Sequence, residues 1–232
     1  MKQGSYRKLD YDVDIVFCID VTESMGAERM LDNIKQNAVN FYDDFVRAME
    51  EKGKKVRNLR IRIVAFRDYY YDGDEAMLET DFFMMPQQAE DLRACLSCIV
   101  AAGGGDDPED GLEAIAHAIK SDWCNGPGKK RHVIVVWSDE GTHELGFGKS
   151  VPNYPKGMAK NFDELTRWWG NANNPGVMDN NAKRLLMFTP DKPGWSNIRE
   201  CWNNCIHYQS EAGLGLVDVD YKQILEALRN SV

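Results

Sequence analysis

Short apolar runs rich in β-branched residues alternate along this chain with segments whose apolar residues recur at helical spacing. The runs predict strands at residues 13–19, 59–66, 132–137, 184–189 and 205–209, with a weaker edge strand at 77–84. The helical stripes predict helices at residues 29–50, 87–102, 109–120, 162–169, 195–203 and 221–230. Strands that alternate with helices in this way are typical of a doubly wound α/β fold. We therefore expect a mostly parallel central sheet of about six strands, with helices on both faces and one antiparallel edge strand.

The same pattern predicts one folded domain. Residues 1–10 form a polar lead-in, and residues 11–232 contain no internal repeat, low-complexity tract or convincing linker. A chain of 232 residues is long enough for one large α/β domain with a full core. Residues 67–74 and the glycine- and proline-rich residues 146–159 are predicted to be loops.

Charge and composition exclude some classes of partner. The formal net charge of −9 argues against a general affinity for nucleic acid or for an anionic membrane. The first residues lack the apolar region of a signal peptide, and no apolar run reaches the roughly 20 residues of a spanning helix. The pairs Cys95/Cys98 and Cys201/Cys205 raise the question of a zinc site, but small buried thiols are the simpler interpretation. We expect a reduced, cytoplasmic protein.

Candidate chemistry begins where the first predicted strand ends. Asp20, Thr22 and Ser24 occupy alternate positions there, so an extended turn would point all three side chains the same way. A carboxylate with two hydroxyls suits a hard cation such as Mg²⁺, and ligands of open α/β sheets bind at the carboxyl ends of the strands. Such residues are also common in turns and helix caps, and this stretch alone leaves both interpretations open.

Two later stretches place more carboxylates at the ends of predicted elements. Asp139 follows the strand at 132–137. The stretch 103–111 begins with three glycines, which are followed by Asp106 and Asp107; either aspartate can cap a helix that has Pro108 in its first turn. This glycine-rich stretch lacks the lysine and the spacing of a phosphate-binding loop, and its acidity would repel phosphate.

Three separated motifs each lie where a predicted strand or loop reaches the same edge of the sheet. D-V-T-E-S at 20–24, G-G-G-D-D-P-E at 103–109 and S-D-E-G at 138–141 together resemble the von Willebrand factor type A domain and its metal-ion-dependent adhesion site, in the form found in intracellular microbial members. The resemblance runs from about residue 11 to the end of the chain. The family's first motif is usually D-x-S-x-S, and its second loop usually offers a threonine. Counting back from Gly111 assigns that second-loop position to Asp106, with Asp107 as the fallback. The resemblance implies that Mg²⁺, or Mn²⁺ or Ca²⁺, is held by Asp20, Thr22, Ser24, Asp106 and Asp139.

The function that this resemblance implies is a binding module rather than an enzyme. We expect a divalent-metal-dependent protein–protein interaction module in a cytoplasmic assembly or a signalling or stress system. With Asp106 as a third carboxylate, the site would carry a formal charge of about −1 with its cation, so the partner protein would present basic residues to the acidic rim. The alternative is a metal-dependent phosphohydrolase. It is disfavoured because His143 is the only nearby acid or base, and no cation near the three loops would stabilise a phosphoryl group.

Overall fold

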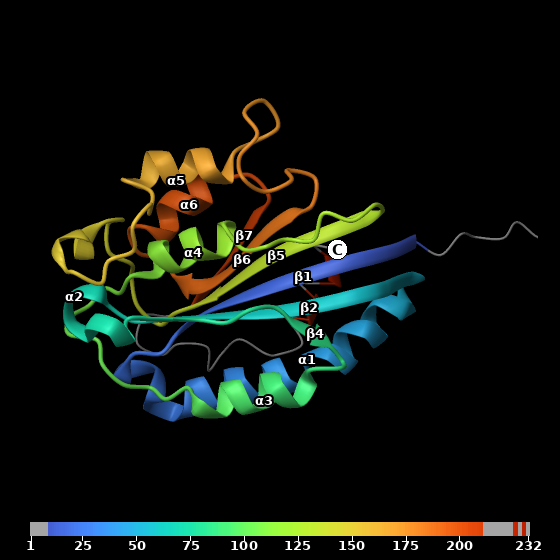
Figure 1. Cartoon of the computed structure of the whole chain (residues 1–232), viewed down its shortest axis with the longest axis horizontal. Helices are drawn as coiled ribbons and strands as arrows, with labels where there is room; N and C mark the ends of the chain where they lie inside the picture. Colours follow the sequence, from blue (N-terminus) through green and yellow to red (C-terminus); the bar gives the residue numbers. More distant parts are fainter. Residues whose placement is uncertain (1–8, 211–224, 227–228, 231–232) are drawn as a thin grey trace, which may run out of the picture.

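The computed structural model describes residues 9–210, 225–226 and 229–230. A seven-stranded sheet with the order β3-β2-β1-β5-β6-β7 runs through the molecule, and β4 also pairs with β2 (Figure 1). All pairings are parallel except those of β3 and β4 with β2. The strands are β1 (Leu9–Asp20), β2 (Lys54–Phe66), β3 (Met77–Glu79), β4 (Phe83–Met85), β5 (Lys129–Trp137), β6 (Lys183–Pro190) and β7 (Cys205–Ser210).

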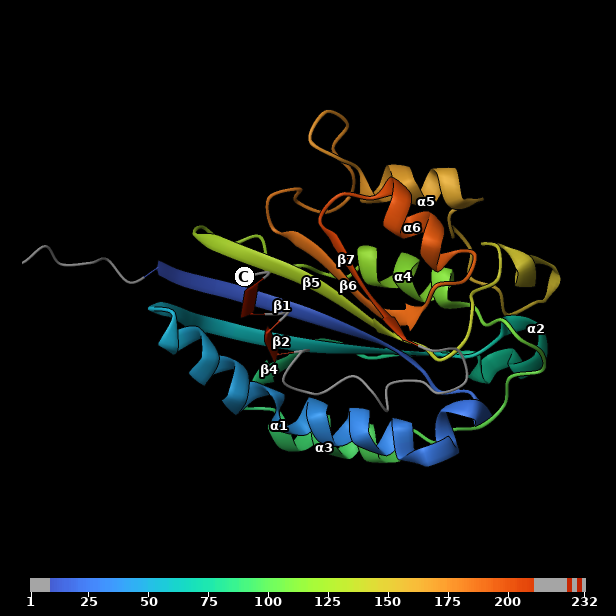
Figure 2. The same cartoon turned by 180° about the vertical axis from the view of Figure 1, so that it is seen from behind.

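Helices cover both faces of this sheet. One face carries α1 and α3, and the other carries α4, α5 and α6, as the two opposite views show (Figures 1 and 2). The helices are α1 (Met30–Glu51), α2 (Tyr69–Asp72), α3 (Ala89–Cys98), α4 (Gly111–Ile119), α5 (Phe162–Trp169) and α6 (Trp195–Cys201). Three short 3₁₀ segments add Glu23–Arg29, Gly73–Glu75 and Phe147–Ser150. The predicted fold class is therefore confirmed.

Strand β1 shows why the sheet is buried on both sides. Successive side chains of a strand point to opposite faces. Ile15 and Phe17 face the core under α1 and α3, whereas Val16 and Cys18 face the core under α4, α5 and α6. All four side chains are buried, which explains the nearly continuous apolar run in the sequence.

Several local predictions need correction. The edge strand predicted at 77–84 is divided into β3 and β4, which pair with different parts of β2. The predicted loop at 67–74 contains α2, because the side chain of Asp68 accepts hydrogen bonds from the backbone N–H groups of Tyr70 and Tyr71. Helix α4 begins at Gly111 rather than at residue 109, with Asp110 instead of Asp106 or Asp107 at its N-cap position. The helix predicted at 221–230 lies largely outside the described residues.

The topology brings four connecting segments to one edge. Strands β1, β2 and β5 are parallel, so the loops after Asp20, Phe66 and Trp137 start at the same end of the sheet. Helix α2 and the segment leading into α4 lie at this end as well (Figure 1). Among the described residues, no helix is both long enough and apolar enough to cross a membrane.

Candidate metal centre

Asp20 ends β1 and is held by hydroxyl groups from two loops. Its side chain is fully buried. Oδ1 accepts hydrogen bonds from the hydroxyl of Thr22 at 2.6 Å and from the backbone N–H of Thr22 at 3.0 Å. Oδ2 accepts a hydrogen bond from the hydroxyl of Ser138 at 2.7 Å. These contacts fix the orientation of the carboxylate.

The first and third loops meet through Ser24 and Asp139. The Ser24 hydroxyl donates to Oδ1 of Asp139 at 3.1 Å and lies 3.1 Å from the Thr22 hydroxyl. Oδ2 of Asp139 is buried and has no hydrogen-bond partner among the described residues. Four of the five residues expected at the metal site, Asp20, Thr22, Ser24 and Asp139, therefore form one connected group of oxygen atoms.

Asp106, the fifth expected residue, points toward a different group. Its Oδ1 lies 3.5 Å from Nε2 of His143, and its Oδ2 accepts a hydrogen bond from the Tyr71 hydroxyl at 3.5 Å. The fallback residue, Asp107, is exposed, and its charge contributes to the raised pKa of Asp139. Within the described part of the chain, neither residue forms a hydrogen bond with the other four members of the expected set.

Glu109 is the second-loop carboxylate that lies beside the first loop. A Cβ atom added to Gly104 would stand 2.8 Å from Oε1 of Glu109 and 3.2 Å from Cβ of Thr22. The side chain of Glu109 is 3% exposed, and its Oε2 has no hydrogen-bond partner among the described residues. After burial, the negative charge of Asp20 is the largest cause of the raised pKa of Glu109. Sequence reasoning assigned Glu109 only to the first turn of a helix and missed this position.

The glycine-rich stretch allows this close approach. Gly103 and Gly104 adopt φ angles of +73° and +77°, which favour glycine. A side chain at Gly103 would overlap the carboxylate of Asp72, which accepts a hydrogen bond from the Gly104 backbone N–H at 3.0 Å. The segment is thus packed directly on α2.

Backbone hydrogen bonds join the second loop to both of its neighbours. The N–H of Glu23 donates to the carbonyl of Gly103 at 3.1 Å. The N–H of Glu109 donates to the carbonyl of Gly141 at 3.3 Å, and the N–H of His143 donates to the carbonyl of Glu109 at 2.8 Å. These two hydrogen bonds form a short parallel β-bridge between Glu109 and Thr142, which places Glu109 next to the third loop.

The crowded carboxylates have raised pKa values. Burial and the charge of Asp139 raise the pKa of Asp20 to about 7. Burial, followed by the charges of Asp20 and other carboxylates, raises the pKa of Glu109 to about 9. Burial also raises the pKa of Asp139. Buried carboxylates in contact are stable only when a proton or a cation neutralises them. The unpaired oxygens of Glu109 and Asp139, together with the hydroxyls of the first loop, suit an oxygen-coordinated cation such as Mg²⁺.

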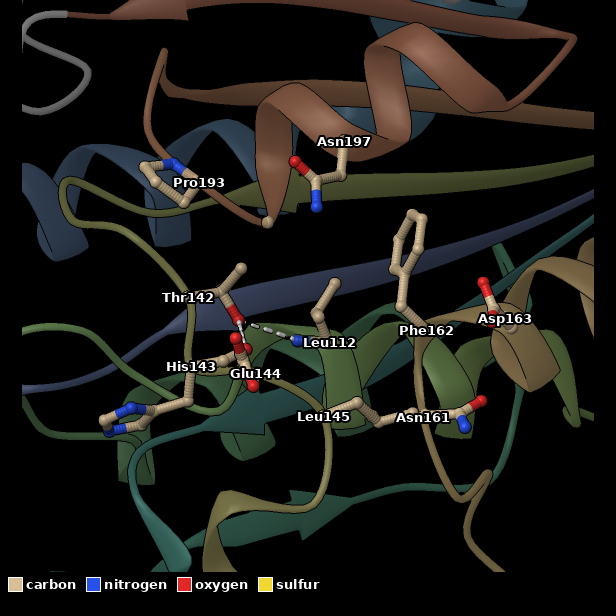
Figure 3. A pocket seen from close by; sticks show the side chains of 11 residues that line it. Leu112, Thr142, His143, Glu144, Leu145, Asn161, Phe162, Asp163, Pro193 and Asn197 are labelled. Carbon is tan, nitrogen blue, oxygen red and sulfur yellow. Dashed lines mark hydrogen bonds between the residues drawn. The ribbon is translucent and has the colours of Figure 1, made fainter.

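A cleft of about 300 Å³ borders the third loop. Thr142 and Leu112 form one wall of this cleft. The hydroxyl of Thr142 accepts a hydrogen bond from the backbone N–H of Leu112 at 3.1 Å (Figure 3). The side chain of Asn197 points toward this wall from α6, whereas the ring of His143 turns away to the side (Figure 3). The sequence prediction placed no cation near the three loops. In the structure, Lys192 lies beside the third loop and forms an ion pair with Glu140 of that loop.

Comparison with known proteins places the chain in a family. The family model for the von Willebrand factor type A domain matches residues 15–142, more than half of the chain. No curated protein matches this chain. The minor pilin PilB from Streptococcus sanguinis has a similar structure, with a TM-score of 0.53 at 11% identity over 97% of this chain and 62% of that one. The pilus adhesin SpaC from Lactobacillus rhamnosus GG aligns with a TM-score of 0.49 at 12% identity over 97% of this chain and 31% of that one. The chain thus spans less than two thirds of either protein. It belongs to the von Willebrand factor type A domain family.

Proposed function

We propose that this domain is a divalent-metal-dependent protein–protein interaction module. Domains of this family are in general interaction and adhesion modules. The observation that carries the proposal for this chain is the meeting of Ser24 and Asp139 at the sheet edge, with one Asp139 oxygen buried and unpaired. A cation bound there would supply positive charge at a surface that is otherwise acidic.

The proposed ligand set combines the sequence expectation with the geometry. Thr22 and Ser24 contribute hydroxyls, Asp20 and Asp139 contribute carboxylates, and Glu109 takes the second-loop position in place of Asp106. These ligands are all oxygen atoms, which suits Mg²⁺, with Mn²⁺ or Ca²⁺ as substitutes. Three carboxylates around one divalent cation sum to a formal charge of about −1.

The surface around the site suggests the chemistry of the partner. Exposed acidic residues line the three loops: Glu23, Asp106, Asp107 and Glu144. Beside them the rings of Tyr70, Tyr71 and Phe147 are 55%, 50% and 45% exposed, and Tyr70 contacts both of the others. Exposed aromatic side chains are favoured anchors in protein interfaces. We therefore propose a partner protein that presents basic residues to the acidic rim and apolar groups to these rings.

We also propose that the domain works in a cytoplasmic multi-protein assembly. All six cysteines are free, including the spatially close pair Cys95 and Cys98. Free thiols suit a reducing compartment.

The function is tested by affinity capture from native cells with the full chain as bait. Captures are compared in Mg²⁺, in EDTA, and in EDTA followed by an excess of Mg²⁺. We expect a partner that is retained in Mg²⁺, released by EDTA and recovered when Mg²⁺ is restored. The same partner should be absent with Asp20→Ala and present with the exposed control Asp10→Asn. A partner set that is the same in Mg²⁺ and in EDTA would refute metal dependence.

A further inference from the structure

Three buried, chemically active side chains from three segments meet next to the site described above. Asp68 follows β2, Asp110 precedes α4 and His143 follows β5. Their side chains are 0%, 0% and 6% exposed. One oxygen or nitrogen atom from each lies within 4.8 Å of the others, and Nε2 of His143 is 2.7 Å from Oδ2 of Asp68.

In each carboxylate of this group, one oxygen accepts hydrogen bonds from backbone N–H groups and the other does not. Oδ1 of Asp68 accepts hydrogen bonds from the backbone of α2. Oδ2 of Asp110 accepts one from the N–H of Tyr69 at 2.7 Å. The remaining oxygen, Oδ1 of Asp110, is buried and accepts no hydrogen bond from any described residue. A fully buried, unpaired carboxylate oxygen is costly unless a proton or a cation neutralises it.

Within the part of the chain that the structure describes, no set of side chains at this group balances its negative charge. Asp68 and Asp110 with a protonated His143 would still sum to a formal charge of about −1. Glu113 lies beside Asp110, is fully buried and has its own unpaired oxygen, Oε2. A divalent cation with a neutral imidazole and two carboxylates would be neutral overall.

We infer that Asp68, Asp110 and His143 form a second cation site, separate from the Mg²⁺ site proposed above. One imidazole nitrogen with two carboxylates suits a borderline transition metal, in particular Zn²⁺, better than Mg²⁺. Asp106 completes the group from the solvent side, because its Oδ1 is 3.5 Å from Nε2 of His143 and its side chain is 38% exposed. The side chain that the sequence assigned to the first site is thus the entrance ligand of the second.

A second His-containing group elsewhere in the fold fits a metal less well. Asp14, Cys124 and His132 meet beside the middle of β1, away from the carboxyl edge. There the carboxylate of Asp14 is already occupied by two hydrogen bonds from Arg60, at 2.7 and 2.8 Å, and by one from the N–H of Cys124 at 2.7 Å. The positive charge of Arg60 also disfavours a cation at that position.

The proposed cation would join the three loops that surround the first site. Asp68 anchors α2, Asp110 stands at the start of α4, and His143 belongs to the loop that follows Asp139. The ring of His143 also stacks on the exposed Phe147 at a centroid distance of 3.9 Å. A metal bound here would hold the rim of the interaction surface in one arrangement. The inference does not depend on the proposed function, because it rests on a different set of ligands.

The test uses the full chain, stripped of metal and reloaded with Zn²⁺ in an excess of Mg²⁺. We expect one tightly bound Zn²⁺ per chain by elemental analysis and titration calorimetry. Asp110→Asn and His143→Gln should each weaken Zn²⁺ binding at least tenfold, and Asp106→Asn should weaken it less. Asp20→Asn should retain Zn²⁺ while losing Mg²⁺, which separates this site from the proposed function. His117→Gln, which alters a histidine paired with Glu79, is the matched control.

Two further measurements do not depend on the folding of any variant. Co²⁺ in the wild-type chain should give a spectrum of nitrogen and oxygen ligation, without the charge-transfer band of a thiolate ligand. Anomalous diffraction from Zn²⁺-loaded crystals should place a peak between Asp68, Asp110 and His143. A thiolate band, a peak at the cysteines, or no retained Zn²⁺ would each overturn the inference.

Discussion

The hydroxyl of Ser24 lies 3.1 Å from Oδ1 of Asp139, although 115 residues separate the two in the sequence. Strands β1 and β5 are hydrogen-bonded neighbours in parallel, so the loops that follow them must emerge side by side. This contact joins the first and third loops at the carboxyl edge of the sheet.

Mg²⁺ should stabilise the folded chain through this edge. A ligand that binds only the folded state at 100 times its Kd adds about 2.7 kcal/mol. For a domain of this size we expect the melting temperature to rise by roughly 5–10 °C. Asp20→Ala should abolish most of the rise, whereas Asp10→Asn should preserve it. Differential scanning fluorimetry with and without Mg²⁺ makes the comparison, and an equal shift in wild type and Asp20→Ala would place the binding elsewhere.

Glu109, rather than Asp106, should determine Mg²⁺ affinity. Glu109→Gln preserves the shape of the side chain but removes the charge beside Asp20. We expect it to weaken Mg²⁺ binding about tenfold, equivalent to about 1.4 kcal/mol, while Asp106→Asn changes it less than about twofold. Calorimetric titration of both variants decides between them. If Asp106→Asn is the damaging change and Glu109→Gln is silent, the original sequence assignment is right.

Gly111→Ala should destabilise the protein, although alanine is normally the better helix former. An added Cβ would stand 2.3 Å from the ring of Trp195, which is fully buried and donates its indole N–H to the Glu140 carbonyl at 2.9 Å. Because this ring cannot move away freely, we expect a loss of about 1–3 kcal/mol in urea unfolding. Gly126→Ala is the control, since its nearest contact would be 3.9 Å away. Equal stability of the two variants would show that α6 adjusts at no cost.

The stability contributed by Asp12 should depend on pH. Hydrogen bonds from Arg57, and then from Asn58, lower the pKa of Asp12 below its usual 3.8, against the opposing effect of burial. A carboxyl whose folded-state pKa is lowered stabilises the protein above the unfolded pKa, and this contribution is lost as the pH falls through the folded pKa. Asp12→Asn should therefore cost about 1–3 kcal/mol at neutral pH.

This difference between wild type and Asp12→Asn should shrink as the pH falls below 3.8. Urea unfolding followed by circular dichroism at a series of pH values measures it. The exposed Asp10→Asn change should have little effect at any pH. A constant difference down to the acid limit would mean that Asp12 acts through shape and not through charge.

The sequence alone was sufficient for the fold class and for much of the candidate site. Buried strands leave nearly continuous apolar runs, and amphipathic helices leave a stripe at helical spacing, so their order is visible without a structure. The sequence was enough to predict that four side chains lie close together, because parallel strands end at one edge of a sheet. These side chains are Asp20, Thr22, Ser24 and Asp139. Their hydrogen bonds in the structure agree with that placement.

Tertiary structure decided which second-loop carboxylate approaches the first loop. The path of residues 103–110 depends on the packing of Gly103 against Asp72 and on the backbone bridge between Glu109 and the third loop. These contacts join segments far apart in the sequence, so local propensity carries no signal for them. Counting back from Gly111, where α4 does begin, assigned the second-loop position to Asp106, but the count carries no information on which carboxylate of this loop faces Asp20. The burial of Asp68 and Asp110 beside His143 likewise appears only when β2, α4 and the loop after β5 are assembled.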